Sequence, residues 1–117
     1  MILVNSEQFV DRIRIVVRDG AVSEALGVLN SPPGRRPSEE LQERSIWYNS
    51  LDNDQKRIVS SVVLDAVNRA IFGFLCVIDG VRAIENDEEK GTLELRYVKS
   101  DSVLLNPPDG EMLHELW

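Results

Sequence analysis

The feature that most constrains the fold is an apolar stripe in the segment between Asp54 and Asp79. Its apolar residues recur three and four positions apart, which is the spacing of one side of an α-helix. A stripe of this length must be covered in water, so we expect one long helix at the centre of a small folded domain. The apolar members are at positions 58, 59, 62, 63, 66, 67, 70, 71, 74, 75 and 78.

The second half of this helix is apolar on its back as well. From Ala70 onward the back is formed by Phe72, Gly73 and Cys76, and a helix that is apolar all round is buried all round. A glycine inside a helix costs about 1 kcal/mol relative to alanine. We therefore expect another backbone to approach closely at Gly73, and we expect Gly80 to end the helix.

Three shorter helices are predicted before the long one. The first follows Ser6, and Gly20 in a left-handed conformation is expected to end it; the second covers residues 22–29. The proline-rich segment Ser31–Pro37 breaks the chain, and Ser38 begins the third helix. Asn53 or Asp54 is the expected cap of the long helix. The inward residues of the first helix are Phe9, Val10, Ile13, Val16 and Val17.

After Gly80 the pattern changes to the two-residue period of strands. Strands are predicted at residues 81–84, 92–98 and 103–105, followed by a final helical turn ending in a docked Trp117. The predicted fold class is α+β, as a single domain over residues 1–117. A helical N-terminal two-thirds surrounds the long central helix, and a small antiparallel β hairpin or meander and a short C-terminal helix follow.

The charge distribution bears on possible partners. The net charge is −7, and residues 59–117 hold five basic and eleven acidic side chains. Such a field opposes nucleic acid and attracts a basic protein surface, although it also simply favours solubility. The candidate partner-binding residues are the acidic ones of the predicted hairpin region: Glu85, Asp87, Glu88, Glu89, Glu94 and Asp101.

The sequence gives little support for a disulfide, a membrane span or a nucleic-acid surface. The only cysteine, Cys76, cannot form an internal disulfide, which fits a reducing cytoplasm. The uninterrupted apolar run Ala70–Ile78 has nine residues, against about twenty for a membrane span, so no membrane association is expected. Arg35 and Arg36 lie in the proline-rich connector, and two arginines are too few for a nucleic-acid surface.

Catalytic and metal-binding residues are also scarce. The only histidine, His114, is expected on the surface, so nucleophilic catalysis lacks its base. One histidine and one cysteine do not make a zinc or copper site. The acidic run Glu85–Glu89 lacks the pattern of a calcium loop, and the dispersed glycines form no phosphate-binding loop. We therefore expect neither a metal nor a cofactor.

The function predicted from the sequence is that of a small acidic, non-enzymatic protein-interaction domain. Bacterial immunity proteins, which inhibit basic nuclease toxins, are an analogy at the level of a protein class. One alternative is a homodimer formed through the long helix or the C-terminal one. Another is an enzyme that uses only carboxylates, with Glu85 or Glu94 as acid or base.

Overall fold

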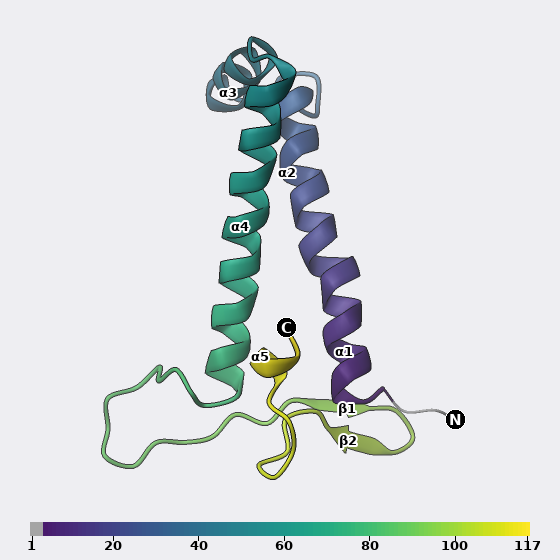
Figure 1. Ribbon diagram of the computed structural model, residues 1–117, viewed down its shortest axis with the longest axis vertical. Coiled ribbons are helices and arrows are strands. Elements are labelled where there is room, and N and C mark those ends of the chain that lie inside the picture. Colours follow the sequence, from purple (N-terminus) through teal and green to yellow (C-terminus); the bar gives the residue numbers. More distant parts are fainter. Residues whose placement is uncertain (1–3) are drawn as a thin grey trace. The chain divides into compact units, whose positions relative to one another are not determined.

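The computed structural model of the protein describes residues 4–117. Helices come first, and a small antiparallel strand pair and a short helix follow, which confirms the predicted α+β class (Figure 1). The elements in chain order are α1 (Ser6–Ile13), the π-helix η1 (Arg14–Asp19), α2 (Gly20–Asn30), α3 (Glu39–Asn49), α4 (Asn53–Ile78), β1 (Arg96–Val98), β2 (Ser102–Leu104) and α5 (Leu113–Leu116).

The described chain forms two compact units. One combines residues 4–15 with residues 69–117, and the other is Val16–Asn68. Helix α4 is a single uninterrupted helix (Figure 1). Its residues belong partly to one unit and partly to the other. Its bounds agree with the predicted long helix to within one residue at each end.

The predicted helix end at Gly20 is wrong. Among the described residues, positive φ angles are found only at Gly34 and Gly80, so Gly20 keeps a right-handed backbone. The wider turns of η1 therefore pass directly into α2 without a break. At the start of α1 the cap is Asn5, whose side chain accepts a hydrogen bond from the Gln8 backbone N–H at 2.8 Å.

In the unit formed by Val16–Asn68, the proline-rich break and the cap at Ser38 are both confirmed. The Ser38 hydroxyl accepts from the Leu41 N–H at 3.3 Å. The Asn49 amide donates to the Asn30 carbonyl at 2.9 Å and so ties the end of α2 to α3. The cap of α4 is Asp52, and neither Asn53 nor Asp54, because the Asp52 carboxylate accepts from the N–H three residues later at 2.8 Å.

The core of the other unit is built from both ends of the chain. Val10 of α1, Leu75 of α4 and Leu113 of α5 are buried against one another. Trp117 packs against this core, as predicted, and the Arg14 guanidinium lies 5.2 Å from its ring centroid. The partly buried residues around the three are Phe9, Ile71, Ile78, Leu95, Leu116 and Trp117.

The predicted strand at residues 81–84 is wrong. Gly80 has φ +79°, and the Val81 N–H donates to the Cys76 carbonyl at 3.0 Å, which closes α4 as a Schellman motif. The Arg82 N–H donates to the same carbonyl at 3.2 Å. These backbone donors are therefore used by the helix end and cannot join a sheet, and residues 81–95 form an open loop (Figure 1).

The antiparallel pair is shorter than predicted. Tyr97 pairs with Val103, and one further backbone bond joins the Leu105 N–H to the Leu95 carbonyl at 2.7 Å. The Asn106 side chain then crosses between elements: its amide donates to the Ile78 carbonyl at 3.1 Å and accepts from the Leu95 N–H at 2.8 Å. Asn106 thus fixes the start of the hairpin to the end of α4.

The prediction that α4 is buried all round from Ala70 onward is wrong. Phe72 and Phe74 are exposed, while Leu75 is buried. The other elements of this unit are the eight-residue helix α1, two three-residue strands and a four-residue helix, which together do not surround α4. At Gly73 the close neighbour is the Arg82 guanidinium and not a backbone. The expected inward positions Val16 and Val17 are also exposed, in contrast to Val10.

Candidate functional site

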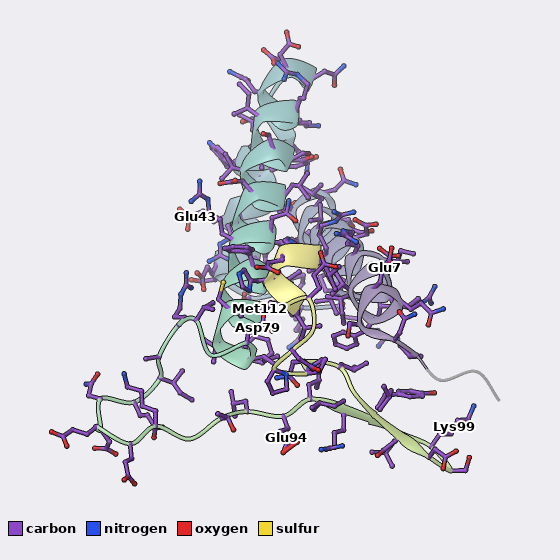
Figure 2. All side chains as sticks on the ribbon, turned by 60° about the horizontal axis from the view of Figure 1, so that its bottom comes forward. Glu7, Glu43, Asp79, Glu94, Lys99 and Met112 are labelled. Carbon is purple, nitrogen blue, oxygen red and sulfur yellow. The ribbon has the colours of Figure 1, made fainter. Side chains whose placement is uncertain are left out.

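The structure does not gather the six predicted acidic residues into one surface. Glu85 accepts a hydrogen bond from the Gly91 N–H at 2.6 Å within the open loop. Glu94 points away from the chain and pairs with Arg96 at 2.7 Å (Figure 2). Asp101 belongs to the turn of the hairpin, where its carbonyl accepts from the Lys99 N–H. The remaining three, Asp87, Glu88 and Glu89, are exposed in the open loop.

A histidine–carboxylate pair was missed by the sequence reasoning. The expectation that His114 is a surface residue is wrong: its side chain is 18% exposed, and Nδ1 lies 2.7 Å from Asp79 Oδ2. The Asp79 side chain is 1% exposed and also accepts from the N–H groups of Leu113 and His114, at 3.1 and 2.8 Å. Figure 2 shows Asp79 beside Met112 at the start of α5.

This pair fixes α5 to the end of α4. The carboxylate satisfies two N–H groups at the start of α5, as an N-cap would, and orients the imidazole. The other ring contact of His114 is the edge of Phe72, with centroids 5.8 Å apart.

Metal ligands are not clustered in the described part of the chain. No group of three or more histidine, cysteine, aspartate or glutamate side chains there is placed to hold a metal ion. The unit Val16–Asn68 has a shallow hollow of about 540 Å³ between α2 and α3, lined mainly by aliphatic side chains. A second hollow of about 490 Å³ includes Arg35 and Arg36 but is largely open to solvent.

The most unusual surface is on α4, whose apolar stripe consists of two neighbouring rows with a spacing of four residues. The covered row is buried or half-buried, and every member of the exposed row is open to solvent. Ile58, Val62 and Phe74 are 55%, 63% and 64% exposed. The covered row is Val59, Val63, Val67, Ile71 and Leu75, and the exposed row is Ile58, Val62, Ala66, Ala70 and Phe74.

The exposed row also bears on whether α4 is apolar enough to cross a membrane. Its most apolar 18-residue window has a mean hydropathy of 1.8 with 17% of its residues buried, so by length and composition the helix is able to cross a membrane. The sequence reasoning missed this because it counted only the uninterrupted run Ala70–Ile78. Core helices of water-soluble proteins share the same length and composition, but they are mostly buried.

An extended apolar row in water is a typical mark of an interaction site. Soluble monomers rarely expose contiguous large apolar patches, and those that they do expose usually bind something. The sequence showed the row, because its residues belong to the stripe, but it did not show which of the two rows the chain leaves uncovered. Comparison with protein-family models, with curated proteins and with solved structures finds no match for this chain.

Proposed function

We propose that this protein is a non-enzymatic protein-interaction domain that associates through the exposed row of α4. The observation that carries the proposal is the exposure of Ile58, Val62 and Phe74 on the same helix whose next row is covered. Burying such side chains contributes about 25 cal/mol for each Å² of apolar surface removed from water. Association would thus bury the exposed row, which the chain itself leaves in water.

The interaction is of the helix-packing type. Rows with a spacing of four residues are the ridges that fit between the ridges of another helix in the commonest packing class of globular proteins. Ala66 and Ala70 in the middle of the exposed row allow a close approach of the partner. Larger side chains at Ile58 and Phe74 border that contact.

Two variants of α4 test the proposal. Val62→Glu places a charge in the exposed row, and Leu64→Glu is the matched control, because Leu64 is 40% exposed but lies outside both rows. Both should remain folded by circular dichroism. We expect the association measured by sedimentation velocity, or by capture of a partner on the immobilised protein, to weaken at least tenfold for Val62→Glu only. Equal behaviour of both variants would contradict the proposal.

A second candidate function concerns the acidic loop. Asp87, Glu88 and Glu89 are exposed, and no side-chain hydrogen bond or ion pair engages them within residues 4–117. Three adjacent carboxylates of this kind would accelerate association with a basic protein surface and select for it. This is the part of the predicted acidic site that remains available; Glu85 and Glu94 are engaged by other groups of their own segment.

The salt dependence of binding separates the two candidates. A triple variant Asp87→Asn, Glu88→Gln and Glu89→Gln should lose capture of a basic protein at low ionic strength, whereas neutralising the exposed Glu39 and Glu40 of α3 should have a smaller effect. Raising the salt from about 0.05 M to about 0.5 M should weaken acidic-loop binding strongly and helix packing little. Binding that is insensitive to both changes would exclude the acidic loop as the contact surface.

A further inference from the structure

The outer edge of the hairpin strand β1 is a second unpartnered surface. On the inner edge, the Leu93 carbonyl accepts from the Asn106 amide at 2.8 Å, and the Leu95 carbonyl accepts from the Leu105 N–H at 2.7 Å. Residues 92–95 lead into β1 without a bend, and successive backbone groups of a strand point to opposite edges. The groups on the outer edge are therefore those of the even-numbered residues: Thr92, Glu94, Arg96 and Val98.

This outer edge has no strand beside it. In the described part of the chain the sheet consists of β1 and β2, and Tyr97 pairs with Val103 on the inner edge. No hydrogen bond within residues 4–117 engages the backbone of Glu94 or Arg96. Both side chains are exposed, Val98 is 68% exposed, and Figure 2 shows Glu94 pointing away from the hairpin. An edge of this kind is a ready template for another strand.

We infer that the occupant of this edge is the same edge of a second copy, paired antiparallel about a two-fold axis at Leu95. The inference goes beyond the proposed function, because it uses a surface other than the exposed row of α4. The edge segment, Thr92–Val98, complements itself in this register, and symmetry forms each contact twice. The facing pairs are Thr92 with Val98, Leu93 with Tyr97, Glu94 with Arg96, and Leu95 with Leu95.

The apolar face of the hairpin continues across this pair. Odd-numbered side chains of the edge segment share one face, on which Leu95 packs against the core. Tyr97 is half-buried, and Leu93 is 47% exposed. In the two-fold pair, Leu93 meets the aromatic ring of Tyr97 from the other copy, and aromatic–aliphatic pairs of this kind stabilise neighbouring strands. A second copy thus covers a leucine that the single chain leaves in water.

The register follows from the parity of the backbone groups and from the charges. Outward-pointing groups face each other only if even-numbered residues of both copies are opposite. An axis at Glu94 would then oppose two carboxylates, and an axis at Arg96 would oppose two guanidinium groups; like charges opposite each other are destabilising. Glu94 and Arg96 also pair within the chain at 2.7 Å. The charges therefore select the register, and the backbone groups supply the contact.

An extended peptide of another protein is the competing occupant. Natural sheet edges are often protected by charges of one sign, most often lysine, which repel a second copy. The edge segment instead has one acidic and one basic residue in self-complementary order, and the exposed Val98 at its end. Nothing in this pattern repels the same segment of another chain, so self-pairing is favoured.

A proline on the outer edge tests the pairing. Glu94→Pro removes an outward N–H that its own chain does not use, and proline is tolerated where a strand N–H faces solvent. Glu94→Ala is the matched control, because it removes the same carboxylate and keeps the N–H. Both are made in the full Val62→Glu chain, so that association through α4 does not contribute. By sedimentation equilibrium, Glu94→Pro should raise the dissociation constant at least tenfold, and Glu94→Ala by less than about threefold.

The two variants should unfold at nearly the same urea concentration, because neither changes a hydrogen bond between β1 and β2. Equal dissociation constants for Glu94→Pro and Glu94→Ala would overturn the inference. A Val62→Glu chain that stays monomeric at the highest concentrations would overturn it as well. If that monomer captures an extended peptide, and Glu94→Pro abolishes the capture, the edge belongs to another protein and not to a second copy.

Cysteine cross-linking measures the direction and register independently. Thr92 and Val98 are exposed, so cysteines there leave the core intact, and Cys76→Ala removes the natural thiol. In an equal mixture of Thr92→Cys and Val98→Cys chains, oxidation should join unlike chains, because facing residues of an antiparallel pair lie within disulfide distance. Disulfides mainly between two Thr92→Cys chains would indicate a parallel pair and overturn the inference.

The failure of this inference and the failure of the proposed function give different results. Loss of partner capture in Val62→Glu but not in Leu64→Glu supports the exposed row of α4, whatever the edge segment does. Cross-linking of Thr92→Cys to Val98→Cys in the Val62→Glu chain supports the edge pair, whatever α4 binds. Each surface is therefore tested without the other.

Discussion

The buried carboxylate of Asp79 accepts a hydrogen bond from the His114 ring, and these two residues are 35 positions apart in the chain. The same carboxylate accepts the first backbone N–H groups of α5. A single side chain at the end of α4 therefore holds the last helix, and α5 in turn supplies the buried Leu113. The stability of this unit should depend on it.

Replacing Asp79 by alanine should destabilise the fold by about 2–4 kcal/mol. The change leaves two N–H groups of α5 and the His114 ring without their acceptor in a mostly buried place, and each such group costs about 1–3 kcal/mol before the structure relaxes. Urea unfolding followed by circular dichroism measures the change. Asp87→Ala in the exposed loop is the control and should stay within about 0.5 kcal/mol. If both variants lose the same free energy of unfolding, Asp79 does not have the structural role described here.

Leu113 should be one of the most sensitive core positions. Its side chain is fully buried between α1 and α4, so Leu113→Ala should cost about 2–5 kcal/mol through lost burial and the cavity left behind. Leu93→Ala removes the same atoms from a half-exposed position and should cost much less. The unfolding midpoints of the two variants in guanidinium chloride provide the comparison, and similar midpoints would place Leu113 outside the core.

Two glycine-to-alanine changes should have opposite effects on stability. Gly80 has φ +79°, where alanine is strained, so Gly80→Ala should lower stability by about 1–2 kcal/mol. Gly20 lies within continuous helix, and an added methyl group there meets nothing within 4 Å. Gly20→Ala should therefore raise stability by about 0.5–1 kcal/mol. Thermal unfolding measures both, and a destabilising Gly20→Ala would argue against a helix that continues through that residue.

Asn106 should be needed for its amide donors and not only for its size. Asn106→Asp keeps the oxygen that accepts from the Leu95 N–H but loses the donor to the Ile78 carbonyl and to the Leu93 carbonyl. We expect a loss of about 1–3 kcal/mol, since a carboxylate then faces two carbonyl oxygens. Urea unfolding at neutral pH tests this, with Asn53→Asp at the exposed start of α4 as the control. If Asn106→Asp leaves the free energy of unfolding unchanged, the hydrogen bonds from the Asn106 amide contribute little to stability.

Much of the helical part of the fold could be predicted from the sequence, because helices are encoded locally. The apolar stripe and Gly80 placed α4 to within a residue, and Ser38 marked the start of α3. The predicted helix end at Gly20 was wrong because a glycine is able to continue a helix as well as to end one. The predicted strand at residues 81–84 is absent because the Schellman closure of α4 at Gly80 already uses the Val81 and Arg82 N–H groups.

The candidate site could be predicted only in part, because its exposure depends on tertiary structure. All residues of the exposed row are present in the predicted stripe, but which row is covered depends on how many other elements are available to pack on α4. The Asp79–His114 pair depends on how the chain returns after 35 residues, and neither position has a local signal. The six acidic residues are exposed, and their distribution over a loop and a hairpin is set by tertiary structure.

The pairing of α1 with α5 has a consequence for biosynthesis. Arg14 donates to the carbonyl oxygen of Leu116, a residue 102 positions later in the chain. At a translation rate of about 5–20 residues per second, α1 emerges from the ribosome roughly 5–20 s before the segment that covers it. During that interval Phe9 and Val10 lack the native packing that Leu113 of α5 supplies. A nascent chain is thus most exposed to proteases until the residues of α5 have been made.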